Sequence, residues 1–148
     1  MLTIPVIHPA LLGALARAGH GSAILIADGN YPHETGSART AERIYLNFMP
    51  GLLTVSQVLA GVAGIVPVER ARVMGPADGA DVPVFAEYER LLGGMALERL
   101  ERFEFYDTAR QPDLAVMIAT GDQQHYANIL LTVGVVNPSR GTSPGGLR

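Results

Sequence analysis

Cysteine and lysine are both absent from this chain of 148 residues, and its eleven basic residues are all arginines. The absence of cysteine excludes disulfides, zinc–thiolate sites and thiol nucleophiles. The absence of lysine excludes Schiff-base chemistry and the phosphate-binding lysine of a P-loop. Enzyme mechanisms that depend on a cysteine or a lysine side chain are therefore excluded for this protein.

Concentrated positive charge and long apolar runs are also missing. The net charge is −3 and the arginines are scattered, whereas a nucleic-acid partner needs a clustered basic surface. No apolar stretch reaches the length of about 18 residues that indicates a membrane helix. The N-terminal residues 1–21 show no basic region ahead of an apolar run, as a signal peptide would. We expect a cytoplasmic protein with no nucleic-acid or membrane partner.

Signature motifs for common cofactors are absent as well. The sequence has no G-x-G-x-x-G, no G-x-S-x-G nucleophile elbow and no H-E-x-x-H. Its four histidines are widely spaced, so they could form a metal site only if the fold brought them together. We expect neither a metal ion nor a cofactor.

The apolar content predicts one domain with a true core. Apolar residues make up 48% of the chain and charged residues 17%, which is typical of a globular protein. We place this domain at residues 1–136. Residues 137–148 are rich in glycine, proline, serine and arginine, and they predict a disordered C-terminal tail.

Strand and helix signals alternate along the domain. Ala23–Ala27 and Leu114–Ala119 are continuously apolar, as strands buried on both faces are. Further strands are expected at 43–48, 71–74, 101–105 and 129–136, and helices after Pro9 and at 54–66 and 82–92, with Gly19 as the left-handed residue that ends the first helix. This order predicts a single three-layer α/β/α domain around a mostly parallel central sheet.

Two polar residues flank the first buried strand, and each has two interpretations. Asp28 follows the strand, where ligands bind in α/β folds, but it would also suit a simple turn. His20 precedes the strand and lies between two glycines. It could transfer protons near neutral pH, or it could stabilise the end of a helix.

Three more residues are candidates with equally plain alternatives. Phe103 and Phe105 alternate with Arg102 and Glu104, so we place Arg102 on a strand, as a ligand-binding guanidinium or half of a solvated ion pair. Tyr126 and Asn128 could hydrogen-bond a polyol, or they could simply begin the last strand.

Taken in order, several short motifs resemble the RbsD/FucU family of monosaccharide mutarotases. They are His8-Pro9, G-H-G at 19–21, D-x-N-[FY]-P at 28–32, R-F-E-F-Y at 102–106, T-G at 120–121 and Y-A-N-I-L-L at 126–131. The R-F-x-F-Y motif is more similar to the L-fucose mutarotase branch than to the D-ribose pyranase branch.

The resemblance implies a cofactor-independent isomerase with His20 as the catalytic residue. It further implies that Asp28, Arg102, Tyr126, Ala127 and Asn128 bind the sugar. It also implies a ring-shaped homo-oligomer, for example a decamer, with sites near subunit boundaries. The expected activity is ring opening and closure of L-fucose or a related sugar. D-ribose pyranase activity and non-catalytic sugar binding for a transporter are the alternatives.

Overall fold

One six-stranded sheet organises the chain, with the strand order β2-β5-β1-β6-β3-β4. The computed structural model describes residues 1–137, so the expected tail lies outside the described residues apart from Asn137. The strands are β1 (Ala23–Ala27), β2 (Glu42–Tyr45), β3 (Val68–Met74), β4 (Glu98–Leu100), β5 (Leu114–Ala119) and β6 (Ile129–Val133).

Strand β6 runs against the other five strands. It pairs antiparallel with β1, where Leu25 lies opposite Leu130, and antiparallel with β3 on its other side. The remaining pairs, β1 with β5, β2 with β5 and β3 with β4, are parallel. The prediction of a mostly parallel sheet is therefore confirmed.

The strand at the centre is apolar along its whole length because both of its faces are covered. All five residues of β1 are buried, as the unbroken apolar run predicted. Ile24 and Ile26 belong to the core on one face, whereas Leu25 belongs to the core on the other.

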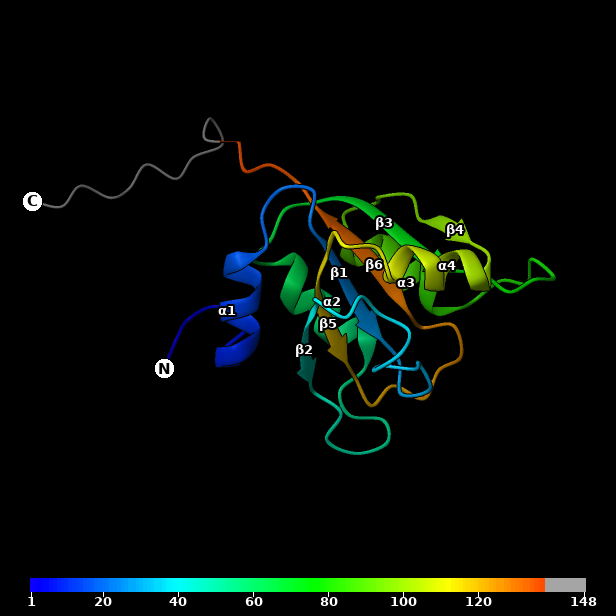
Figure 1. Ribbon diagram of the computed structural model, residues 1–148, viewed down its shortest axis with the longest axis horizontal. Helices are drawn as coiled ribbons and strands as arrows, with labels where there is room; N and C mark the ends of the chain where they lie inside the picture. The colour runs from blue at the N-terminus through cyan, green and yellow to red at the C-terminus, as the bar shows by residue number, and fades with distance from the viewer. Residues whose placement is uncertain (138–148) are drawn as a thin grey trace, which may run out of the picture.

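Helices cover the two faces unequally (Figure 1). The helices α1 (Pro9–Arg17), α2 (Val55–Ala63) and α3 (Val84–Leu91) pack on one face. The helix α4 (Arg102–Ala109) and the segment 31–41 pack on the other. This arrangement confirms the three-layer domain. None of the helices within residues 1–137 has the length and apolar character needed to cross a membrane.

Local capping signals fix where two of the helices begin. The side chain of Thr54 accepts a hydrogen bond from the Gln57 amide, and the Gln57 side chain accepts one from the Thr54 amide. This capping box starts α2. The Nδ1 atom of His8 accepts a hydrogen bond from the Leu11 amide at 3.2 Å and starts α1.

The end of α1 differs from our expectation. The helix ends at Arg17, Ala18 is extended, and the left-handed glycine is Gly21, with a φ of 82°, rather than Gly19. The extended residue Ala18 leads the chain out of the helix directly, so the turn that needs a positive φ comes only just before β1.

The segment that we expected as a strand at 101–105 is helix α4 instead. Its apparent alternation rests on only two phenylalanines, and a spacing of two residues places them on different sides of a helix. Phe105 is buried completely, whereas Phe103 is 67% exposed. The Glu101 carboxylate accepts a hydrogen bond from the Phe103 amide at 2.9 Å and caps the helix.

This difference between the two phenylalanines is testable by substitution. We expect Phe105→Ala to lower the free energy of unfolding by about 3–5 kcal/mol, because it removes a ring from the core. We expect Phe103→Ala, the matched control, to change it by less than about 0.5 kcal/mol, because that ring lies on the surface. Urea denaturation measures both. Equal losses from the two variants would contradict the helix.

Candidate active site

Polar residues from distant parts of the chain meet at one edge of the sheet. Strands β1 and β5 are parallel, so both end at this edge, and Asp28 and Thr120 follow them directly. Strand β6 is antiparallel to β1, so it begins at the same edge, directly after Asn128. Ligands of α/β proteins bind beyond the carboxyl ends of parallel strands, and the site lies in that position.

Asp28 and Asn128 bind each other through two hydrogen bonds. The Asp28 amide donates to Oδ1 of Asn128 at 2.8 Å, and Nδ2 of Asn128 donates to Oδ2 of Asp28 at 3.0 Å. The Asn30 amide donates to the other carboxylate oxygen, Oδ1 of Asp28, at 2.9 Å. Both interpretations of Asp28 therefore hold. Its side chain bonds the backbone of its own turn, and its carboxylate also lines the site.

Burial raises the pKa of the Asp28 carboxyl above its ordinary value of 3.8. Asp28 is only 3% exposed, so its charged form loses most of its hydration. The hydrogen bonds from the amides of Asn30 and Tyr31 and from Asn128 act in the opposite direction, while the nearby negative charge of Asp122 adds to the increase.

A hollow of about 200 Å³ lies over this pair. Its lining residues are Asp28, Asn30, Tyr31, Met74, Arg102, Tyr106, His125, Tyr126 and Asn128. Four of the predicted sugar-binding residues are therefore brought together. Ala127 lies behind them, fully buried, and its carbonyl accepts a hydrogen bond from the Tyr88 hydroxyl at 2.7 Å.

Arg102 brings a positive charge to the mouth of the hollow. As the first residue of α4, it lies two helical positions from Glu104, and residues at that spacing do not face each other. An ion pair with Glu104, one of the two alternatives for Arg102, is absent among residues 1–137. The guanidinium carbon instead lies 5.7 Å from the centre of the Tyr106 ring. The neighbouring Tyr106 hydroxyl holds the pKa of Arg102 above its ordinary value.

Tyr126 adopts a backbone conformation that tyrosine rarely takes. Its φ is 62°, and it is the one residue other than glycine with a positive φ among residues 1–137. Such a conformation costs about 1–3 kcal/mol and persists only where the surroundings hold it. The two residues that follow it supply that support, because Ala127 is bound by Tyr88 and Asn128 by Asp28.

His20 lies at the other end of β1 from this hollow. It precedes Ala23, whereas Asp28 follows Ala27, and a strand of five residues spans roughly 17 Å at about 3.3 Å per residue. The Nε2 atom of His20 lies 3.1 Å from Oε2 of Glu69, and both side chains are about half exposed. A single chain therefore does not bring His20 to Asp28.

The structure adds residues that sequence reasoning missed. Tyr31, Tyr106 and Met74 line the hollow, and so does His125. The sequence signal for His125 as a site residue was its position directly before Tyr126. Its wide spacing from the other histidines gave no indication of a site. Burial raises the pKa of the Tyr31 hydroxyl, which donates a hydrogen bond to the Gly36 carbonyl at 2.5 Å.

Metal ligands do not gather in the part of the chain that the structure describes. No group of three histidine, cysteine, aspartate or glutamate side chains within residues 1–137 is arranged to hold an ion. The chemistry available at the hollow is hydrogen bonding by a carboxyl, two amides, a guanidinium and hydroxyls, together with the imidazole of His125.

Comparison with known proteins identifies the family of this chain. The model of the RbsD / FucU transport protein family matches residues 1–136. The chain belongs to the RbsD/FucU family. This confirms the resemblance that its motifs indicated.

Two curated relatives of this RbsD/FucU chain represent both branches of the family. The human fucose mutarotase is 34% identical over 144 residues, covering 88% of this chain and 90% of the relative. The D-ribose pyranase of Paracidovorax citrulli is 35% identical over 134 residues, covering 87% and 94%.

A solved structure matches the fold of this RbsD/FucU chain. It is the fucose mutarotase of Streptococcus pneumoniae in complex with L-fucose, with a TM-score of 0.80 and 26% identity. The match covers 93% of this chain and 100% of that one.

The raised pKa of Asp28 predicts how its carboxyl titrates. We expect a midpoint above 3.8 in a carbon-13 NMR titration, with the spectrum of Asp28→Asn identifying the resonance. Because the folded state then holds the proton more tightly than the unfolded state, the contribution of Asp28 to stability is present below pH 3.8. That contribution is lost as the pH rises through the raised pKa. A midpoint below 3.8 would show that the hydrogen bonds outweigh burial.

Proposed function

We propose that this RbsD/FucU-family chain is a monosaccharide mutarotase, which opens and recloses a sugar ring without a cofactor. The observation that carries the proposal is the hollow in which a buried Asp28–Asn128 pair faces the same space as Arg102 and Tyr126. The similarity to fucose mutarotases and to a D-ribose pyranase supports the same chemistry.

The lining of the hollow suits a small polyol. The Asp28 carboxylate accepts hydrogen bonds from hydroxyl groups, and charge-assisted bonds of this kind are strong. The Arg102 guanidinium has the complementary role. It carries only donors, so it donates hydrogen bonds to the sugar oxygens. The rings of Tyr106 and Tyr126 offer apolar faces against which the carbon–hydrogen bonds of a sugar can pack.

The reaction needs two proton transfers and nothing else. A base takes the proton of the anomeric hydroxyl while an acid protonates the ring oxygen, and the bond between the anomeric carbon and the ring oxygen breaks. The electron pair of that bond goes to the ring oxygen, and the anomeric oxygen becomes an aldehyde oxygen. Rotation and the reverse transfers close the ring on the other face. A positioned acid–base group contributes about 10²–10⁴-fold to such a step.

We assign one of these transfers to His20, supplied by a second copy of the chain. Within one chain His20 and Asp28 flank opposite ends of β1, so a complete site requires another subunit. Glu69 is placed to orient the imidazole, because its Oε2 atom lies 3.1 Å from Nε2 of His20. This division supports the ring-shaped homo-oligomer, with sites at subunit boundaries, that the family resemblance implied.

Exposed apolar side chains are available for contacts between copies. The loop before α2 exposes Phe48, Met49, Leu52 and Leu53, with Phe48 81% exposed. Apolar surface gathered in this way is typical of interaction sites.

The proposed substrate is L-fucose or a related sugar. The R-F-x-F-Y motif at 102–106 and the similarity to fucose mutarotases support this choice. D-ribose pyranase activity is the second candidate, because a D-ribose pyranase is 35% identical to the chain.

Exchange NMR tests the proposed activity directly. We expect the purified protein to accelerate exchange between the anomers of L-fucose, and to do so equally well in EDTA, because the reaction uses only side-chain acids and bases. D-ribose in the same experiment reports exchange between pyranose and furanose forms. Buffer-level exchange for both sugars and for D-galactose would contradict the mutarotase, and loss of activity in EDTA would contradict the cofactor-independent mechanism.

Complementation tests whether the site is shared between copies. We expect His20→Ala to lose most of the rate but to keep much of the sugar affinity, because its proposed role is confined to the transition state. We expect Asp28→Ala to lose affinity as well, because it removes an acceptor for the bound sugar. Calorimetry measures affinity and exchange NMR measures rate.

Co-expression of the two variants then separates the alternatives. Mixed oligomers pair an intact His20 of one copy with an intact Asp28 of another, so activity should return in part. Each variant expressed alone is the matched control. Mixed oligomers as inactive as the single variants would show that one chain supplies both residues.

A further inference from the structure

His125 is the one histidine of the described residues whose imidazole has no partner within the chain. His8 caps α1, His20 lies against Glu69, and the Nε2 atom of His33 lies 2.8 Å from the Asp28 carbonyl oxygen. Neither hydrogen bonds, ion pairs nor ring contacts within residues 1–137 engage the His125 side chain, which is exposed. Its two ring nitrogens are therefore free to meet a ligand.

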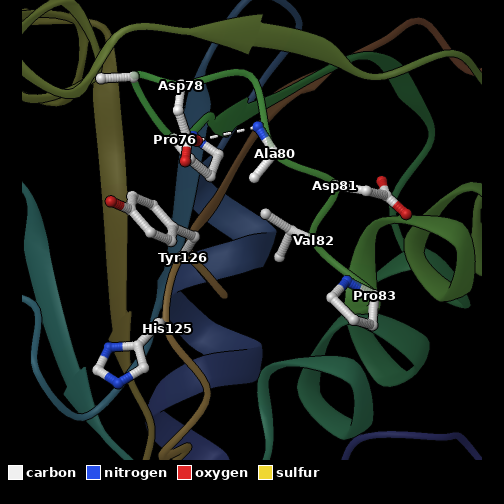
Figure 2. A pocket seen from close by; sticks show the side chains of 9 residues that line it. Pro76, Asp78, Ala80, Asp81, Val82, Pro83, His125 and Tyr126 are labelled. Atoms are coloured by element: carbon white, nitrogen blue, oxygen red, sulfur yellow. Dashed lines mark hydrogen bonds between the residues drawn. The ribbon is translucent and has the colours of Figure 1, made fainter.

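Its position places it where three hollows meet. The hollow of about 200 Å³ over Asp28, a hollow of about 530 Å³ beside Gly29 and Asn30, and one of about 520 Å³ along the segment 76–83 all have His125 in their walls. Figure 2 shows the last of these, with Tyr126 and His125 following one another along one side and the segment from Pro76 to Pro83 along the other.

The loop that carries His125 is anchored on both sides. Before it, the Asp122 carboxylate accepts hydrogen bonds from the Val55 amide at 2.8 Å and from the Gln124 amide at 2.9 Å. After it, the Tyr88 hydroxyl holds Ala127, and Asn128 is bound to Asp28. These bonds fix the backbone on both sides of His125, and a group that transfers protons needs a defined position of this kind.

Other side chains in the small hollow are less suited to exchanging a proton at neutral pH. The Asp28 carboxylate is assigned to hold the sugar by accepting hydrogen bonds from its hydroxyl groups, beside those that it accepts from Asn30 and Asn128. An arginine keeps its proton at neutral pH, which excludes Arg102. The hydroxyl of Tyr31 is committed to the Gly36 carbonyl. Histidine, in contrast, is the side chain that ordinarily gains and loses a proton near neutral pH.

We propose that His125 is a second catalytic residue of this chain, acting as the partner of His20 in ring opening; the inference rests on the proposed mutarotase function. Neutral His125 takes the proton of the anomeric hydroxyl, and the electron pair of that O–H bond becomes the second bond of the aldehyde. The bond to the ring oxygen breaks, and protonated His20 of a second copy donates its proton to that oxygen. Ring closure returns both protons, so each turnover restores both histidines.

The test uses two substitutions of His125 in the full chain. His125→Asn keeps a hydrogen-bonding side chain but cannot exchange a proton, and we expect the L-fucose exchange rate to fall about 10²-fold or more. We expect the dissociation constant from calorimetry to change by less than about threefold, because the lost interaction belongs to the transition state. Gln123→Ala, an exposed change in the same loop, is the matched control and should keep the wild-type rate.

Imidazole rescue separates a proton-transfer role of His125 from a structural one, because added imidazole can replace a missing proton-transfer group but cannot repair a structural defect. We expect added imidazole to restore part of the rate of His125→Ala and to leave the rate of Gln123→Ala unchanged. Rates within about threefold of wild type in both His125 variants would overturn the proposal, and so would a loss of rate matched by an equal loss of affinity. A wild-type protein that is inactive on all the sugars would overturn the proposed function itself, and this inference with it.

Discussion

The reciprocal pair between Asp28 and Asn128 is the interaction on which the site depends. The two residues are 100 positions apart in the sequence, yet each donates a hydrogen bond to the other. The pair ties the end of β1 to the beginning of β6, and the hollow lies over this junction. A buried carboxyl without such partners would be strongly unfavourable.

The same edge of the sheet is reinforced from the helical layer that contains α2 and α3. Asp122 joins the loop after β5 to the N-terminus of α2, and Tyr88 of α3 holds the carbonyl of Ala127. These contacts support the unfavourable backbone conformation of Tyr126 between them. The residues around the hollow are thus held by packed elements, which keeps polar groups at fixed distances without a ligand present.

The separation of His20 from Asp28 is the reason that the proposed mechanism needs two copies of the chain. A five-residue strand keeps the two residues at opposite edges of the sheet, and the family resemblance implies sites near subunit boundaries. Exposed apolar residues on the loop before α2 provide surface for contacts between copies. In the mechanism that we propose, assembly supplies one acid–base group and the chain's own loop supplies the other.

The sequence by itself determined the buried strands and the family. The unbroken apolar runs of β1 and β5 can exist only where both faces of a strand are covered, and the ordered motifs identify the relatives. Tertiary structure alone decided that Arg102 begins a helix, that Asp28 meets Asn128, and that His125 lines the hollow. The physical reason is that local spacing defines a periodicity only over several turns or repeats. Which distant ends meet depends instead on strand direction, and a motif read along the chain does not contain that information.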